Sequence, residues 1–149
     1  MAVTLSSDTG TQKLKIVQYV SAALPQTTTS DIFTVSGVVQ VTNIIGFTTT
    51  AIQAQANNMK LGFDVGGGSQ NISADLDING DAQFTMYNLT GTVTDPANEV
   101  ATGIHNAMEA PFVFFSGDIT MTCSASSTGA IDWYVTYIPL SPGAEIALA

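Results

Sequence analysis

The segment Asp75-x-Asp77-x-Asn79-Gly80-Asp81 has the residue types and spacing of a calcium-binding loop. Oxygen-bearing side chains stand at its first, third and fifth positions and a glycine at its sixth, as in an EF-hand loop. The twelfth position, where such loops carry a bidentate Glu, is Met86. The carboxylates therefore have two interpretations, a cation site or the solvated face of a β-hairpin, and the missing Glu favours the hairpin.

The chain has one histidine, His105, and one cysteine, Cys123, that could serve in nucleophilic catalysis. A nucleophile and its base must lie within hydrogen-bond distance, so the fold would have to bring these distant residues together. Cys123 falls on the apolar side of the alternating run 119–125, which predicts a buried, unreactive thiol. Neither residue stands in a spacing typical of metal ligands.

Paired carboxylates are the other candidates for chemistry, because glycoside hydrolysis uses two of them. The acids from which such a pair could be drawn are Asp95, Glu99, Glu109 and Asp118. With 12 acidic residues in 149, some pairs must lie close together without any catalytic role. We therefore predict no catalytic, cofactor-binding or metal-binding site, and a protein that is not an enzyme.

Exposed aromatic side chains would indicate sugar binding. The available residues are Tyr19, Tyr87, Trp133, Tyr134 and Tyr137. Most of them fall at alternating positions of strand-like segments, where packing in a core or an interface explains them. Glycan binding therefore stays as an alternative to a purely structural role.

The charge of the chain is strongly negative, with a formal net charge of −9 and only 10% charged residues. Lys13, Lys15 and Lys60 are its only basic residues. Nucleic acids and acidic membrane surfaces bind through clusters of Lys and Arg, so neither is expected as a partner. The start of the sequence has no export signal, and no apolar run is long enough to span a membrane.

Strand-like runs separated by turn residues recur along the chain. They cover residues 13–20, 31–36, 38–45, 47–54, 59–65, 70–78, 82–90, 111–116, 118–125 and 130–138. About ten short strands predict an all-β fold, a single antiparallel β-sandwich or jelly-roll domain over residues 13–149. Residues 97–110 fit a short helix or a long loop, and residues 1–12 fit a flexible N-terminal arm or a frayed terminus.

A hairpin register follows from hydrophobic alternation on both sides of Asn79-Gly80-Asp81. A three-residue loop there would pair Ile78 with Ala82 and Leu76 with Phe84, which keeps the apolar residues on one face. We therefore expect a β-hairpin centred on this turn.

The segment 130–138 carries large side chains on both faces of one predicted strand. Ile131, Trp133, Val135 and Tyr137 alternate with Asp132, Tyr134, Thr136 and Ile138. Pro139 ends the strand because it has no N–H to donate. A core on one face and a neighbouring subunit on the other would cover both, which predicts a homo-oligomer.

Two parts of the chain combine residues found together in a known family. The first comprises SDIFTVSG at 30–37, VTNIIG at 41–46 and TTAIQAQANN at 49–58; the second comprises SGDIT at 116–120 and GAIDWYVTYIPL at 129–140. They resemble small structural proteins of tailed bacteriophages, of the kind found as head decoration or other virion-surface proteins. These strand patterns cover about two thirds of the chain and contain no catalytic residues.

The resemblance implies a capsid decoration or cement protein on the outer surface of the phage head. Such a protein binds the major capsid protein and stabilises the assembled shell. Attachment as a repeated unit at symmetry points of the shell favours a cyclic homotrimer. The alternative is a tail-associated or fibre protein that binds a host glycan.

Overall fold

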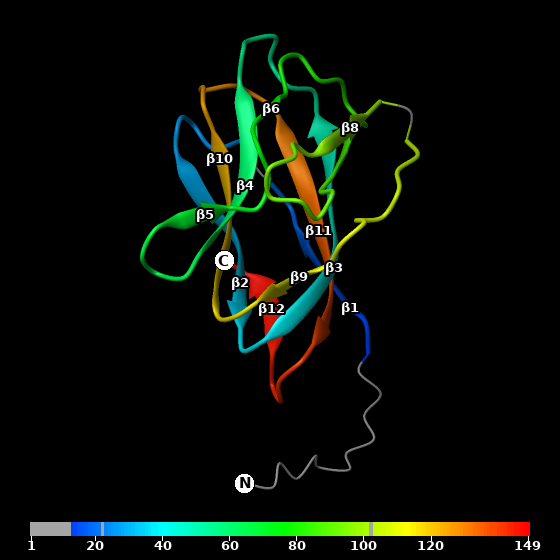
Figure 1. The fold of residues 1–149 in the computed structure, drawn as a ribbon. Coiled ribbons are helices and arrows are strands. Elements are labelled where there is room, and N and C mark those ends of the chain that lie inside the picture. Colours follow the sequence, from blue (N-terminus) through cyan, green and yellow to red (C-terminus); the bar gives the residue numbers. More distant parts are fainter. Residues whose placement is uncertain (1–12, 22, 102) are drawn as a thin grey trace, which may run out of the picture.

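A computed structural model describes residues 13–21, 23–101 and 103–149 (Figure 1). Two antiparallel β-sheets form the molecule, and no helix occurs in the described ranges. None of these residues therefore forms a helix that is long and apolar enough to cross a membrane. The predicted all-β sandwich is confirmed, whereas jelly-roll connectivity stays a prediction. The N-terminal arm predicted over residues 1–12 lies outside the described residues.

The first sheet, sheet A, has the strand order β1-β11-β3-β7-β8, and β9 also pairs with β3. Its strands are β1 (Lys15–Tyr19), β3 (Val39–Thr50), β7 (Met86–Asn88), β8 (Asn98–Val100), β9 (Phe112–Phe114) and β11 (Ala130–Pro139). The long strands β3 and β11 pair along almost their whole length and form the centre of this sheet.

The second sheet, sheet B, has the strand order β12-β2-β10-β4-β5, and β6 also pairs with β4. Its strands are β2 (Thr29–Ser36), β4 (Asn58–Asp64), β5 (Ser69–Asn71), β6 (Leu76–Asp77), β10 (Gly117–Cys123) and β12 (Glu145–Leu148). The edge strands β1 and β12 lie in contact, so the two sheets approach each other along this side of the sandwich.

The segments predicted as strands 38–45 and 47–54 form the single strand β3, which runs through Gly46. Glycine is required there because a Cβ atom would lie 2.7 Å from Cζ3 of Trp133. Gly46 therefore makes room for the indole ring and does not end a strand.

The predicted hairpin around Asn79-Gly80-Asp81 is wrong. Leu76 lies opposite Met59 in sheet B, whereas Met86 lies opposite Phe47 in sheet A. The chain between them crosses from one sheet to the other, and Ile78 is fully buried on the way. Alternation assigned faces to these residues, but it carries no information about which strand will be the partner.

The core lies between the inner faces of the sheets. Trp133, Tyr87 and Phe33 are its largest fully buried side chains. The inner face of β11 is buried as predicted, at Ile131, Trp133, Val135 and Tyr137. Burial of each large apolar side chain contributes roughly 1.5–3 kcal/mol, so these strands hold the sandwich together.

Candidate functional site

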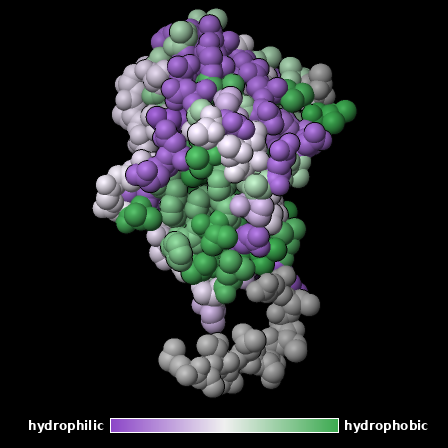
Figure 2. Space-filling view, in the orientation of Figure 1, coloured by the Kyte–Doolittle hydropathy of each residue, from purple (hydrophilic) through white to green (hydrophobic). Residues whose placement is uncertain are grey.

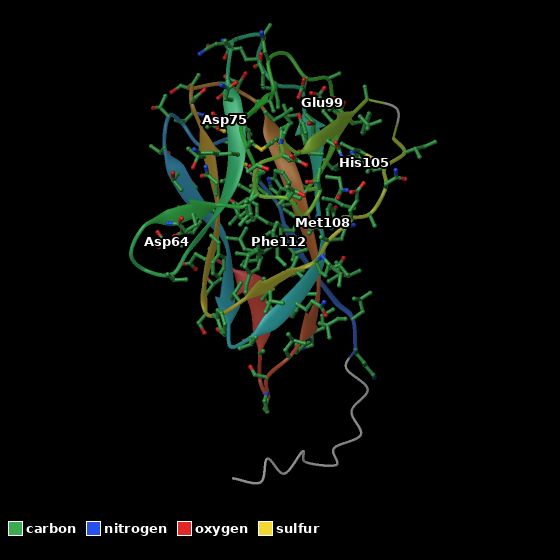
Figure 3. The ribbon with its side chains drawn as sticks, viewed as in Figure 1. Asp64, Asp75, Glu99, His105, Met108 and Phe112 are labelled. Carbon is green, nitrogen blue, oxygen red and sulfur yellow. The ribbon has the colours of Figure 1, made fainter. Side chains whose placement is uncertain are left out.

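Acidic side chains gather at one end of the sandwich. Figure 3 places Asp75 and Glu99 at this end and Asp64 apart from them, beside the β4–β5 hairpin. Burial raises the pKa of Glu99, and the negative charges of Asp81 and Asp77 raise it further. The carboxylates of Asp77, Asp81 and Glu99 therefore lie close enough for their negative charges to repel one another. We call Asp75, Asp77, Asp81 and Glu99 the acidic end.

The carboxylates of the predicted calcium loop each have a partner in the protein. Asp75 Oδ1 lies 3.9 Å from Lys60 Nζ, and Asp77 Oδ1 accepts a hydrogen bond of 3.2 Å from the backbone N–H of Asn79. Asp81 Oδ2 accepts from the hydroxyl of Tyr87. Within residues 13–21, 23–101 and 103–149, no group of three or more His, Cys, Asp or Glu side chains is placed to hold a metal ion. The loop geometry supports a turn held by hydrogen bonds.

Tyr87 joins the acidic end to the core. Its buried hydroxyl donates to Asp81 over 2.5 Å and accepts from Thr48 Oγ1 over 3.1 Å. Burial and the bond to Asp81 raise the pKa of Tyr87 above its usual range. Burial also raises the pKa of Asp81 and outweighs the opposing effect of the Tyr87 hydrogen bond. Tyr87 is thus a protonated donor at neutral pH, and its arrangement fixes the loop that contains Asp81.

His105 and Cys123 lie in different parts of the fold. His105 is in the segment between β8 and β9, and its Nε2 lies 2.9 Å from the backbone oxygen of Asn98. Because a carbonyl oxygen only accepts, Nε2 carries the hydrogen. Cys123 is in β10 of sheet B and is 1% exposed, and burial raises the pKa of its thiol to about 11. The predicted buried thiol is confirmed, and neither side chain contacts the other.

The candidate glycosidase acids are spread over different elements. Glu99 belongs to β8 of sheet A, and Asp118 belongs to β10 of sheet B. Asp118 accepts a hydrogen bond of 2.7 Å from Thr34 on the neighbouring strand. Asp95 lies in the turn before β8, and Glu109 lies in the segment before β9. This placement gives Glu99 and Asp118 separate environments.

Packing accounts for most of the aromatic residues that could have bound a sugar. Trp133, Tyr87 and Tyr137 are buried in the core, whereas Tyr19 and Tyr134 are half-buried. The rings of Tyr87 and Trp133 lie 6.3 Å apart between their centroids. The prediction that packing explains most of these residues is confirmed.

The outer face of sheet A, which points away from the core, is almost without charge. Its central residues are Ile16 and Gln18 of β1, Tyr134 and Thr136 of β11, and Ile45 and Phe47 of β3. Asp132 is the one charged strand residue on this side, and it is only 8% exposed. Its carboxylate accepts hydrogen bonds from the side chain of Gln18 and the backbone of Ser21.

The segment 103–111 crosses one part of this face. The Asn88 side chain donates to the backbone oxygen of Asn106, and the Asn43 side chain accepts from the backbone N–H of Met108 over 3.3 Å. The segment covers β7 and its side of β3. No other described residue of the chain covers the outer surfaces of β1 and β11 or the remaining part of β3.

Exposed apolar side chains gather at the end of the molecule opposite the acidic end. Figure 2 shows hydrophobic residues over the lower part of the visible face and hydrophilic residues over the upper part. The exposed fractions are 58% for Leu14, 53% for Val113, 66% for Phe115 and 42% for Leu140. Val38 lies beside Leu140, whose backbone N–H donates to its carbonyl. We call Leu14, Val38, Val113, Phe115 and Leu140 the apolar end.

The sequence analysis did not identify the apolar end as a site. A usable signal was present in Phe112-Val113-Phe114-Phe115, because this run is apolar at every position and one face must point outward from a strand. Phe114 is buried, whereas its neighbours Val113 and Phe115 are exposed. Large exposed apolar patches mark interaction surfaces, so the apolar end is a candidate binding site.

Comparison of the chain with protein-family models, with curated proteins and with solved structures gave no match. The functional interpretation therefore depends on the surfaces described above. The charge and hydropathy of these surfaces are the features from which a binding role can be inferred.

Proposed function

We propose that this protein is a non-enzymatic structural component of a virus particle, a capsid decoration or cement protein of a tailed bacteriophage. The observation that supports this proposal best is the division of the surface into an apolar end and a hydrophilic end (Figure 2), and the hydrophilic end carries the acidic residues. A domain with this polarity has one end suited to docking on protein and another suited to water. The phage identity itself comes from the sequence resemblance.

The apolar end is the surface through which the protein docks on the major capsid protein. Phe115, Val113 and Leu140 expose large side chains there. Removing apolar surface from water is favourable by roughly 25 cal/mol per Å². The acidic end then faces solvent, where its negative charge keeps decorated particles apart.

The protein acts on the shell by mass action and needs no chemical step. A ligand that binds only the assembled shell stabilises it by about 2.7 kcal/mol per site when its concentration is 100 times its Kd. Because many identical copies bind one symmetric shell, the stabilising free energies of all sites add together and oppose disassembly of the shell.

Binding of the purified protein to phage shells that lack it tests the proposal. We expect the wild type to co-sediment with the shells, and Phe115→Asp to bind at least about 10-fold more weakly because a hydrophobic anchor is replaced by a charge. Val65→Asp is the matched control, since Val65 is 67% exposed and Phe115 is 66% exposed. Failure of the wild type to bind, or equal binding by Phe115→Asp and Val65→Asp, would contradict the proposal.

A further inference from the structure

Phe84 has an unusual backbone conformation and an unusual exposure. Its φ is +74°, in the left-handed region that bulky L-residues avoid. Its side chain is 59% exposed, and its ring centroid lies 6.0 Å from that of Phe47 on the outer face of sheet A. A strained backbone therefore holds an aromatic ring in water next to another aromatic ring.

Hydrogen bonds to β3 hold this conformation. The backbone N–H of Phe84 donates to the carbonyl of Thr48 over 2.8 Å, and the N–H of Thr48 donates to the carbonyl of Thr85 over 2.9 Å. Two residues thus oppose one, which is a β-bulge whose first residue is left-handed and is usually glycine. Glycine would adopt this φ without strain, so the fold itself does not require a phenylalanine at this position.

The surface beside Phe84 is continuous and uncharged. From Phe47 it extends over Ile45 and Tyr134 to Ile16, which is 68% exposed on the edge strand β1. Strands β11 and β3 pair over about 33 Å, and the five-residue β1 adds about 17 Å of strand; at about 4.8 Å per strand this gives roughly 400 Å² per copy. Two such faces would bury on the order of 800 Å², which is typical of a weak, reversible interface.

We propose that the outer face of sheet A, with Phe84 as its aromatic anchor, is the contact surface between copies of this chain. The inference rests on the proposed function, for which the sequence resemblance implies a homo-oligomer, and names the surface that forms it. Because both copies contribute the same face, the contact is isologous and gives a dimer in place of the cyclic trimer that the resemblance favours. The apolar end adjoins this face at Val113 of β9, whereas Phe115 and Leu140 follow the last residues of β9 and β11 and remain free to dock on the shell.

Charge favours a second copy as the occupant. The chain has a net charge of −9, yet the open strand residues of this face include one carboxylate, the buried Asp132. Two acidic molecules can therefore meet here without bringing their exposed carboxylates together. Direct pairing of two β1 edges is disfavoured by Lys15 in β1 and Lys13 just before it, because lysines on an edge strand oppose edge-to-edge association. Contact through the sheet face does not involve this edge.

Sedimentation velocity of the purified full chain tests the inference. We expect the wild type to have about twice the chain mass of 15.5 kDa. Phe84→Gly and Ile16→Asp should each weaken assembly at least about 10-fold, whereas Val65→Asp on the β4–β5 hairpin should leave it unchanged. Phe84→Gly should melt at the same or a higher temperature than the wild type, because glycine relieves the strained φ. This separates loss of contact from loss of folding.

Three outcomes would overturn the inference. The first is a monomeric wild type at about 100 µM, because we expect the contact between two copies to have a Kd below that concentration. The second is unchanged assembly of both face variants. The third is unchanged mass together with lost binding of Phe84→Gly to a host polysaccharide, which would assign the face to a glycan. Shell binding by a monomeric wild type would refute this inference alone and leave the proposed function standing.

Discussion

Tyr87 is the residue through which the loop of the acidic end is fastened to the core. Its ring packs near Trp133, and its hydroxyl lies between Thr48 and Asp81. A buried hydroxyl that both donates and accepts is fully used, so its removal leaves two polar partners unsatisfied. Its role is structural, and it couples the acidic loop to strand β3.

Tyr87→Phe should therefore lower the free energy of unfolding by about 1–3 kcal/mol, because Asp81 loses its donor and Thr48 loses its acceptor. Urea denaturation measures this change. Tyr134→Phe is the control, since Tyr134 is half-buried on the outer face, and its effect should be within about 0.5 kcal/mol. Equal stability of Tyr87→Phe and the wild type would show that the hydrogen bonds contribute nothing.

The charge of Asp81 should make stability depend on pH. Its pKa is raised in the fold, chiefly by burial and also by Asp77, so the native state binds a proton more readily than the unfolded chain. Stability therefore falls as the pH rises from the unfolded pKa, 3.8, through the higher folded pKa. The ionised carboxylate of Asp81 therefore lowers the free energy of unfolding at pH 7.

Asp81→Asn should melt at a higher temperature than the wild type at neutral pH, and the gap should shrink as the pH is lowered toward about 4. The amide oxygen still accepts from Tyr87, so the hydrogen bond is kept. Thermal melts across this pH range measure the difference, with Glu145→Gln on β12 as a control for the loss of one negative charge. A lower melting temperature for Asp81→Asn at pH 7 would contradict the expected sign.

Several residue environments could be predicted from the sequence. Strict alternation placed Cys123 and the inner residues of β11 in the core, and both are buried there. The contact of Tyr87 with Asp81 could not be predicted in the same way. It depends on a loop that crosses between the sheets, and the expected hairpin would have exposed Asp81 to solvent.

At the scale of elements, β3 passes close to the indole of Trp133, because a Cβ at Gly46 would lie only 2.7 Å from the ring. Gly46 lies opposite Trp133 in the register of β3 and β11. The missing side chain lets the ring lie flat over the sheet, and packing at this density leaves no room for a methyl group.

Gly46→Ala should lower the free energy of unfolding by about 1–3 kcal/mol, because the added Cβ forces the indole or the strand to move. Gly67→Ala is the matched control, since a Cβ at Gly67 meets nothing within 4 Å. Chemical denaturation of both variants measures the difference. A Gly46→Ala protein as stable as Gly67→Ala would show that the packing around Trp133 adjusts to the added methyl group without loss of stability.

Most of the long strands could be located from alternation, whereas their partners could not. β2, β4, β10 and β11 lie close to the predicted ranges. The predicted strand 70–78 forms two short strands, β5 and β6, which both pair with β4, and the predicted strand 82–90 is reduced to β7, which pairs with β3. β8 and β12 were not predicted. Each has only three or four residues, which is too short for a period to stand out, and each is defined by its neighbour in the sheet.

At the scale of the whole molecule, polarity along the sandwich is the property that suggests a function. The apolar end and the acidic end are built from segments far apart in the sequence, such as Leu14 and Val113, or Asp77 and Glu99. The composition shows that charged residues are few and mostly acidic. The fold is needed to show which surfaces carry no exposed charge. Docking through the apolar end and self-association through the outer face of sheet A would use both uncharged surfaces.

Cryo-electron microscopy of intact particles of the phage proposed to carry this protein is the most direct test of the proposed function. We predict many copies arrayed on the outside of the head, grouped at symmetry points of the shell, with Phe115 toward the capsid and Glu99 toward solvent. A few copies at the tail tip would indicate host recognition instead. Absence of the protein from the particles would contradict a structural role in the virion.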